Sequence, residues 1–153
     1  MVEAVPSAYR GVISYLILRD AARAITFYEQ AFGAKQALRL DYPDGTVAHA
    51  EVVIAGGHVM MSEEKPEMGH KSAQTLGGSP VSLMFYVPDV DRVFAQAIAA
   101  GGKEFRGVQD QFYGDRSGTL VDPFGIMWTV ATHVEDVPQE EMDRRMAAMG
   151  SGA

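Results

Sequence analysis

Two stretches of the sequence decide the fold, VAHAEVVIAGGHVMMSEE at residues 47–64 and SGTLVDPFGIMWTVATH at residues 117–133. Each contains two runs rich in strand-forming residues on either side of a turn with glycine, which is typical of a β-hairpin. The hairpin glycines Gly57 and Gly125 lie 68 residues apart. The chain therefore contains an internal repeat, and this repeat sets the architecture before any single motif does.

A strand and a helix are predicted before each hairpin. Apolar residues fill positions 12–18 in the first half and 81–87 in the second, and apolar residues at helical spacing follow each run. Each half is therefore expected to fold as βαβββ. The predicted caps are the N-caps Asp20 and Asp89 and the C-terminal glycines Gly33 and Gly102, both pairs 69 residues apart.

The segment SEEKPEMGHKSAQTLGGSP between the halves is polar and interrupted by prolines and glycines, so it is predicted to be a linker. Near the end of the chain, PQEEMDRRMAAM has methionines at helical spacing. It is predicted to form an amphipathic helix whose apolar stripe docks on another surface. We expect one domain over residues 1–153, made of a module at 9–64, the linker at 65–79, a module at 80–134 and the C-terminal helix at 138–149.

The composition is that of one ordinary soluble domain, with 47% hydrophobic and 22% charged residues among 153. A net charge of −7 repels nucleic acid and anionic membrane surfaces, so neither is an expected partner. The absence of cysteine excludes disulfides, thiolate metal sites and cysteine nucleophiles. No apolar run is long enough to span a membrane, and the N-terminus lacks the pattern of a secretory signal. We therefore expect a cytoplasmic protein.

Three motifs, FYEQAFGA at 27–34, AQAIAAGGKE at 95–104 and YGDRSGTLVDPFG at 113–125, resemble those of the vicinal oxygen chelate superfamily. This superfamily includes glyoxalases, bleomycin-resistance proteins and extradiol dioxygenases, and the last motif resembles its PhnB-like branch. The resemblance implies an α+β fold in which two βαβββ modules form a cupped eight-stranded mixed sheet, with helices outside and a ligand cavity inside. Dimers are common in the superfamily. Open sheet edges, a long linker and the methionine stripe also favour a homodimer here.

In the metal enzymes of this superfamily, the ligands lie at four points, on the first and last strand of each module. Anchoring on the helix motifs and on Gly57 and Gly125 places these points at Ile13, Met61, Ser82 and Thr129. None of these side chains is an imidazole, carboxylate or thiolate, which the usual metals require. We therefore expect no metal and no other cofactor, and a binding protein is favoured over an enzyme.

Alternation along the strands extends this assignment, because every second side chain shares a face. The thioethers of Met61, Met84 and Met127 would then line the cup, and such polarizable groups would suit an irregular apolar ligand. The alternative is that these methionines fill a closed core. The opposite faces, which include Met60, Leu83 and Trp128, are predicted to pack beneath the helices. The predicted cup lining is Ile13, Tyr15, Met61, Glu63, Ser82, Met84, Tyr86, Met127 and Thr129.

Arg116 is also predicted to face the cup, because an even hairpin register places it on the face of Thr129. Its guanidinium would clamp a carboxylate or phosphate of the ligand. The alternative is a structural ion pair with Asp115, Glu63 or a carbonyl oxygen. Tyr113 beside it is predicted to lie at the rim of the cup.

His49 and Glu51 are two residues apart on one strand, a spacing that would suit two metal ligands. The predicted hairpin, however, pairs Met61 with Ala50 or Val52. His49 and Glu51 are then expected on the outer face, and only a bulge would bring them to the cavity.

The sequence thus predicts a metal-free glyoxalase/bleomycin-resistance-like protein that binds a small, partly apolar ligand in the sheet cavity. One alternative is a glyoxalase-like lyase or isomerase, or a dioxygenase, with a relocated metal site. Another is an enzyme without metal that uses Glu63, Tyr15, Tyr86 or His133 for proton transfer. One scaffold hosts all three activities, so the fold does not choose among them.

Overall fold

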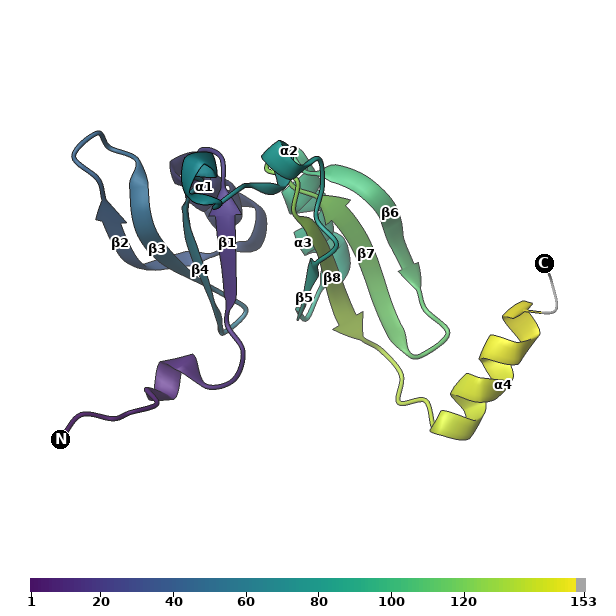
Figure 1. Ribbon diagram of the computed structural model, residues 1–153. Coiled ribbons are helices and arrows are strands. Elements are labelled where there is room, and N and C mark those ends of the chain that lie inside the picture. Colours follow the sequence, from purple (N-terminus) through teal and green to yellow (C-terminus); the bar gives the residue numbers. More distant parts are fainter. Residues whose placement is uncertain (151–153) are drawn as a thin grey trace.

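The protein is described here by a computed structural model that covers residues 1–150 (Figure 1). The expected α+β fold of two βαβββ modules is confirmed, and each module forms its own four-stranded mixed sheet. The strand orders are β1-β4-β3-β2 and β5-β8-β7-β6, and the first pair in each sheet is parallel. The first module contains β1 (Ser14–Leu18), α1 (Ala21–Phe32), β2 (Lys35–Asp41), β3 (Val47–Ile54) and β4 (Gly57–Glu63). The second contains β5 (Ser82–Tyr86), α3 (Val90–Ala99), β6 (Lys103–Asp110), β7 (Asp115–Val121) and β8 (Met127–His133).

The helix caps lie close to their predicted positions. The side chains of Asp20 and Asp89 accept hydrogen bonds from the backbone N–H groups three residues later. Helix α1 ends at Gly33, whose φ of 67° is left-handed and suits glycine. Helix α3 ends at Ala100, two residues before the predicted glycine. The local signals therefore place both helices after the first strand of each module.

A buried carboxylate joins the two modules. Asp122, in the turn before β8, accepts hydrogen bonds from the Tyr28 hydroxyl of α1 at 2.7 Å and from the Trp128 indole at 2.9 Å. Its other oxygen accepts from the backbone N–H groups of Phe124 and Ile126, both at 2.9 Å. Helices α1 and α3 also contact each other, so a continuous core runs through both modules.

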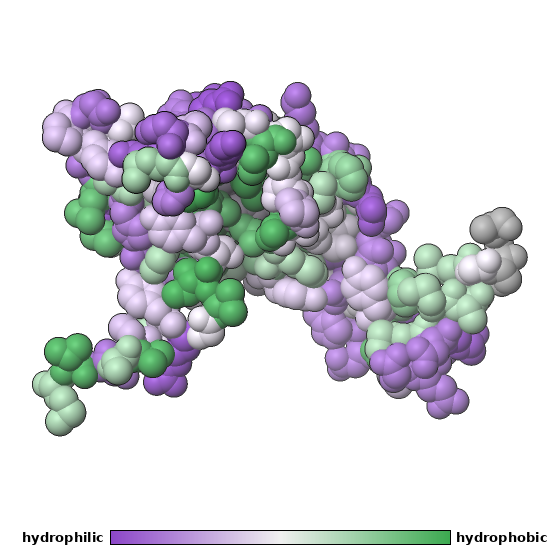
Figure 2. Space-filling model, in the orientation of Figure 1, coloured by the Kyte–Doolittle hydropathy of each residue, from purple (hydrophilic) through white to green (hydrophobic). Residues whose placement is uncertain are grey.

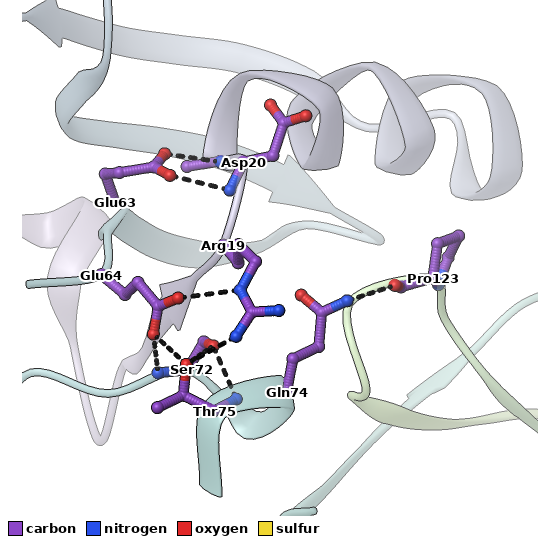
Figure 3. Close-up of polar contacts among 9 residues, drawn as sticks. Arg19, Asp20, Glu63, Glu64, Ser72, Gln74, Thr75 and Pro123 are labelled. Carbon is purple, nitrogen blue, oxygen red and sulfur yellow. Dashed lines mark hydrogen bonds and ion pairs between the residues drawn. The ribbon is translucent and has the colours of Figure 1, made fainter. Parts of the chain in front are cut away.

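The linker folds back onto both modules through η2 (Pro66–Met68) and α2 (Ala73–Leu76). Figure 3 shows Glu64, at the end of the first module, receiving hydrogen bonds from Arg19, from the Ser72 backbone and from the Thr75 hydroxyl. These bonds, led by that from Ser72, lower the pKa of Glu64 to about 2. On the other side of α2, Gln74 donates to the carbonyl of Pro123 in the second module. The linker is therefore an ordered strap.

The C-terminal helix α4 (Gln139–Gly150) lies apart from the two sheets (Figure 1). Arg145 holds it by donating to the Phe112 carbonyl and to the Glu135 carboxylate. Met146 and Met149 remain exposed, and Figure 2 shows hydrophobic residues along one side of this helix. Among residues 1–150, no helix is long and apolar enough to cross a membrane.

We predict that Tyr28→Phe lowers the free energy of unfolding by about 1–3 kcal/mol, because Asp122 stays buried with one donor fewer. Chemical denaturation followed by circular dichroism measures this difference. The control is Tyr113→Phe, which removes the hydroxyl of a more exposed tyrosine and should change stability by less than about 0.5 kcal/mol. Equal effects of the two substitutions would contradict a structural role for the Tyr28–Asp122 hydrogen bond.

Candidate functional site

One face of each sheet packs on the helices, and the other face, here called the open face, does not. Leu16 and Leu18 of β1 are buried in the core, whereas Tyr15, which precedes them on the other face of the strand, is 47% exposed. In β5, Met84 and Tyr86 are likewise 48% and 52% exposed. Large side chains left half exposed on neighbouring strands mark a surface able to bind another molecule.

Several predicted lining residues share the open face. Met84 pairs with Thr129, and Tyr86 pairs with Ala131, so these side chains lie on one side of the second sheet. The hydroxyls of Thr119 and Thr129 are 2.8 Å apart on the same side. Ser82 pairs with Met127 and follows the same alternation, and Ile13 lies one residue before β1. The expected placement of Tyr15, Met84, Tyr86 and Thr129 is therefore confirmed, whereas their binding role stays a prediction.

Met61 and Glu63 do not face the open side, and their expected placement was wrong. Met61 pairs with Leu16 and is fully buried beneath the helices. Both carboxylate oxygens of Glu63 accept hydrogen bonds from backbone N–H groups at the start of α1, those of Asp20 at 2.8 Å and Ala21 at 2.9 Å (Figure 3). Glu63 therefore caps a helix.

The error arose at the hairpin turns. Gly56 has a φ of 83° and Gly125 a φ of 85°, so Gly56 is the true counterpart of Gly125, and the two lie 69 residues apart. Met60, rather than Met61, then corresponds to Thr129. The four superfamily ligand points carry Ile13, Met60, Ser82 and Thr129, and these side chains still do not fit a metal ion.

The same correction moves His49 and Glu51 onto the open face. The predicted pairing of Met61 with Ala50 is confirmed. Because Met61 lies under the helices, Ala50 does too, and its neighbours on β3 point the other way. Glu51 pairs with Met60. No bulge is needed, because the register alone brings these side chains to the site.

A network of hydrogen bonds surrounds Glu51, which is only 4% exposed. One carboxylate oxygen lies 3.1 Å from His49 Nε2, and the other accepts from the Tyr9 hydroxyl at 2.8 Å. His49 Nδ1 in turn lies 2.9 Å from the hydroxyl of Tyr15. Burial raises the pKa of Glu51, but the hydrogen bonds from His49 and Tyr9 outweigh burial and leave this pKa below its ordinary value.

A second network lies on the open face of the other module. Tyr86 donates to Asp115 at 2.6 Å, and His133 Nδ1 lies 2.8 Å from the other oxygen of the same carboxylate. His133 Nε2 lies 2.8 Å from Asp136. The hydrogen bond to Asp115 raises the pKa of Tyr86 to about 12. Asp115 was expected only as a partner of Arg116, although its place beside Tyr113 in the YGDR motif pointed to this region.

Arg116 was wrongly placed in the cup. Thr129 pairs with Thr119, rather than with Gly118 or Leu120, because the turn between β7 and β8 has an odd number of residues, five, whereas the turn between β3 and β4 has two. Arg116 consequently lies on the helix side. It donates twice to Asp91 of α3 at 2.8 Å and once to Asp110 at 3.1 Å. The structural ion pair is correct, with different carboxylates from those expected.

Two pockets lie between β1 and β5, the inner edge strands of the two sheets. The first, of about 380 Å³, is mostly apolar and has Lys71 at its wall. The second, of about 360 Å³, includes His58, Met84 and Tyr86. Ser14 and Leu83 line both pockets, so the two hollows adjoin along the same strands.

The two imidazoles next to Glu51 do not form a metal centre. His49 Nε2 lies beside one carboxylate oxygen, whereas His58 Nδ1 lies 3.6 Å from the other. The ring nitrogens therefore approach opposite oxygens instead of converging on one point. Over the part of the chain that the structure describes, no group of three or more histidine or carboxylate side chains is placed to hold a metal ion.

We predict that His133 titrates with a pKa above 6.5, because Asp115 and Asp136 both stabilise its protonated ring. Its contribution to stability is full below pH 6.5 and is lost as the pH rises through the raised pKa. NMR titration of the imidazole protons measures this value. Asp115→Asn should bring the pKa down, and a wild-type pKa at or below 6.5 would contradict the described network.

The comparisons with known proteins agree with this architecture. The family model of the glyoxalase/bleomycin resistance protein/dioxygenase superfamily matches residues 12–130. An uncharacterized protein of Mycobacterium tuberculosis is 40% identical over 141 residues, which are 90% of this chain and 83% of that protein.

Solved structures share the fold. TioX from Micromonospora sp. ML1 has a TM-score of 0.63 and 26% identity, over 84% of this chain and 99% of that one. A PhnB protein from Bacillus cereus has a TM-score of 0.63 and 19% identity, over 80% of this chain and 99% of that one. The chain therefore belongs to the glyoxalase/bleomycin resistance protein/dioxygenase superfamily.

Proposed function

We propose that this protein binds a small, partly apolar ligand on the open face, between β1 and β5, without a metal ion. The observation that carries the proposal is the half-exposed set of Tyr15, Met84 and Tyr86 beside two adjoining pockets. Covering such side chains contributes roughly 25 cal/mol per Å² of apolar surface removed from water. Methionine also adapts to irregular ligand shapes.

The polar groups of the site favour a particular kind of ligand. The hydroxyl of Tyr86 donates its hydrogen bond to Asp115, and the hydroxyl of Tyr15 is hydrogen-bonded to His49. Each phenolic oxygen still has lone pairs that accept hydrogen bonds. With Arg116 on the other side of the sheet, the anionic group expected from the sequence loses its predicted partner; Lys71 lies at the wall of the first pocket, but the carboxylates of Glu51 and Asp115 on the open face disfavour an anion. We therefore favour a neutral or cationic ligand with an N–H or O–H donor.

We also propose that the protein is a homodimer whose partner subunit covers part of the exposed surface. Leu38 and Leu40 of β2 and Phe105 of β6 are exposed on the outer edge strands. Met146 and Met149 of α4 are exposed as well. Sheet edges and apolar stripes of this kind are normally covered in solution.

Thermal-shift screening of a small-molecule library tests the binding proposal. A bound ligand at about 100 times its dissociation constant should stabilise the fold by about 2.7 kcal/mol. Affinity should fall in Met84→Ala and remain unchanged in Met68→Ala, which removes an exposed methionine that lines neither pocket. Hits that bind both variants with equal affinity would show that the ligand occupies another surface.

Light scattering tests the dimer. We expect a mass of two chains at micromolar concentration, and a truncation that removes residues 138–153 should weaken association because it deletes the apolar stripe of α4. Arg144→Ala is a suitable control, since its side chain is exposed and, among residues 1–150, donates hydrogen bonds to Glu141 of the same helix. A monomeric mass for the full chain would reject the proposal.

A further inference from the structure

Tyr15, His49 and Glu51 form a hydrogen-bonded chain that runs from the open face into the protein. Tyr15 is 47% exposed, whereas Glu51 is 4% exposed. An ionised carboxylate only accepts hydrogen bonds, so His49 Nε2 must carry the proton that it shares with Glu51. When the ring is neutral, His49 Nδ1 is then the acceptor, and the Tyr15 hydroxyl donates to it at 2.9 Å. In this tautomer both hydrogen bonds point toward the buried carboxylate.

We propose that Tyr15 is an activated phenol that takes a proton from a weakly acidic group of the ligand. As the ligand's proton moves to Tyr15 Oη, the phenolic proton moves to His49 Nδ1. The ligand is left as its conjugate base, and His49 becomes an imidazolium held by Glu51. No electron donor or further reactant is needed. The ligand's identity rests on the proposed function, but the activation of Tyr15 does not.

The other tyrosines of the two networks have different partners. Tyr86 and Tyr9 donate directly to carboxylates, to Asp115 and Glu51 respectively. A carboxylate is a weak base and its negative charge opposes ionisation of the phenol, so these hydroxyls keep their protons. Within residues 1–150, Tyr15 is the tyrosine whose hydroxyl is bonded to an imidazole. A neutral imidazole is a stronger base and becomes positive on protonation, which stabilises the developing phenolate.

Glu51, the buried end of this hydrogen-bonded series, is held by residues of the segment before β1 and of β4. Tyr9, in η1 (Ser7–Tyr9), donates to the second oxygen of Glu51 and packs edge-on against His58 at 5.1 Å between ring centroids. His58 Nδ1 lies 3.6 Å from that same oxygen. These groups hold the carboxylate in place, so Glu51 and His49 act as positioning residues, and Tyr15 is the member of the three that faces the ligand.

Labelling with 4-toluenesulfonyl fluoride tests this without knowledge of the ligand. The Tyr15 oxygen forms a bond to sulfur, the sulfur–fluorine bond breaks, fluoride leaves and the phenolic proton passes to His49. Peptide mass spectrometry gives the rate at each tyrosine. Tyr42 and Tyr113 are matched internal controls, because each is 38% exposed. We expect Tyr15 to react roughly 10- to 100-fold faster than either, which is a modest general-base effect.

The His49→Gln variant should remove this advantage, whereas His133→Gln, in the other network, should leave it unchanged. Circular dichroism verifies that both variants fold. Labelling of Tyr15 at the rate of Tyr113, or at equal rates in wild type and His49→Gln, would overturn the proposal.

The pH profile of the wild-type protein gives a second readout that no substitution can confound. The groups that face this chain are Tyr9, Glu51 and His58. The rate at Tyr15 should level off at a lower pH than the rates at Tyr42 and Tyr113, because it depends on an imidazole accepting the phenolic proton. A Tyr15 profile that follows those two controls would also overturn the proposal. Failure of the ligand screen with success of this labelling would reject only the proposed binding function.

Discussion

The hydrogen bonds to Asp122 are the constraint on which the rest of the structure depends. The two sheets share no strand pairing, so their relative position comes from the contact of α1 with α3 and from Tyr28 reaching across to this carboxylate. Burial raises the pKa of Asp122, and four donors offset the cost of burying it. Together with the contact between α1 and α3, this carboxylate therefore positions β1 and β5 and the two pockets between them.

The lengths of the two hairpin turns, two residues in the first module and five in the second, decide which side chains reach the open face. The short turn of the first module pairs Glu51 with Met60, whereas the longer turn of the second pairs Thr119 with Thr129. A shift of one residue reverses the face of every side chain in a strand. The registers set by the two turns place His49 and Glu51 on the open face and Arg116 on the helix side. The turn lengths therefore determine the chemistry of the site.

The fold could be predicted because its signals are local. Asp20, Asp89 and Gly33 cap helices by contacts with neighbouring residues, and the repeat of these signals reveals two modules. Strands β1, β5 and β8 were assigned to the correct faces, since they were anchored to the helices or to Gly125. Strands β3, β4 and β7 were not. Gly56 and Gly57 are adjacent, and only the backbone φ of Gly56 identifies the true counterpart of Gly125.

Without ligands at the four superfamily metal points, chemistry on the open face has to come from the side chains themselves. Two tyrosines there have partners of opposite effect. Asp115 keeps the proton on Tyr86, whose pKa is about 12, whereas the hydroxyl of Tyr15 lies 2.9 Å from a ring nitrogen of His49. A site obtains both an acid and a base when its environment pushes the pKa values of two similar groups apart. A pocket that includes Tyr15 adjoins one that includes Tyr86, so a single small ligand would meet a proton acceptor on one module and a proton-retaining phenol on the other.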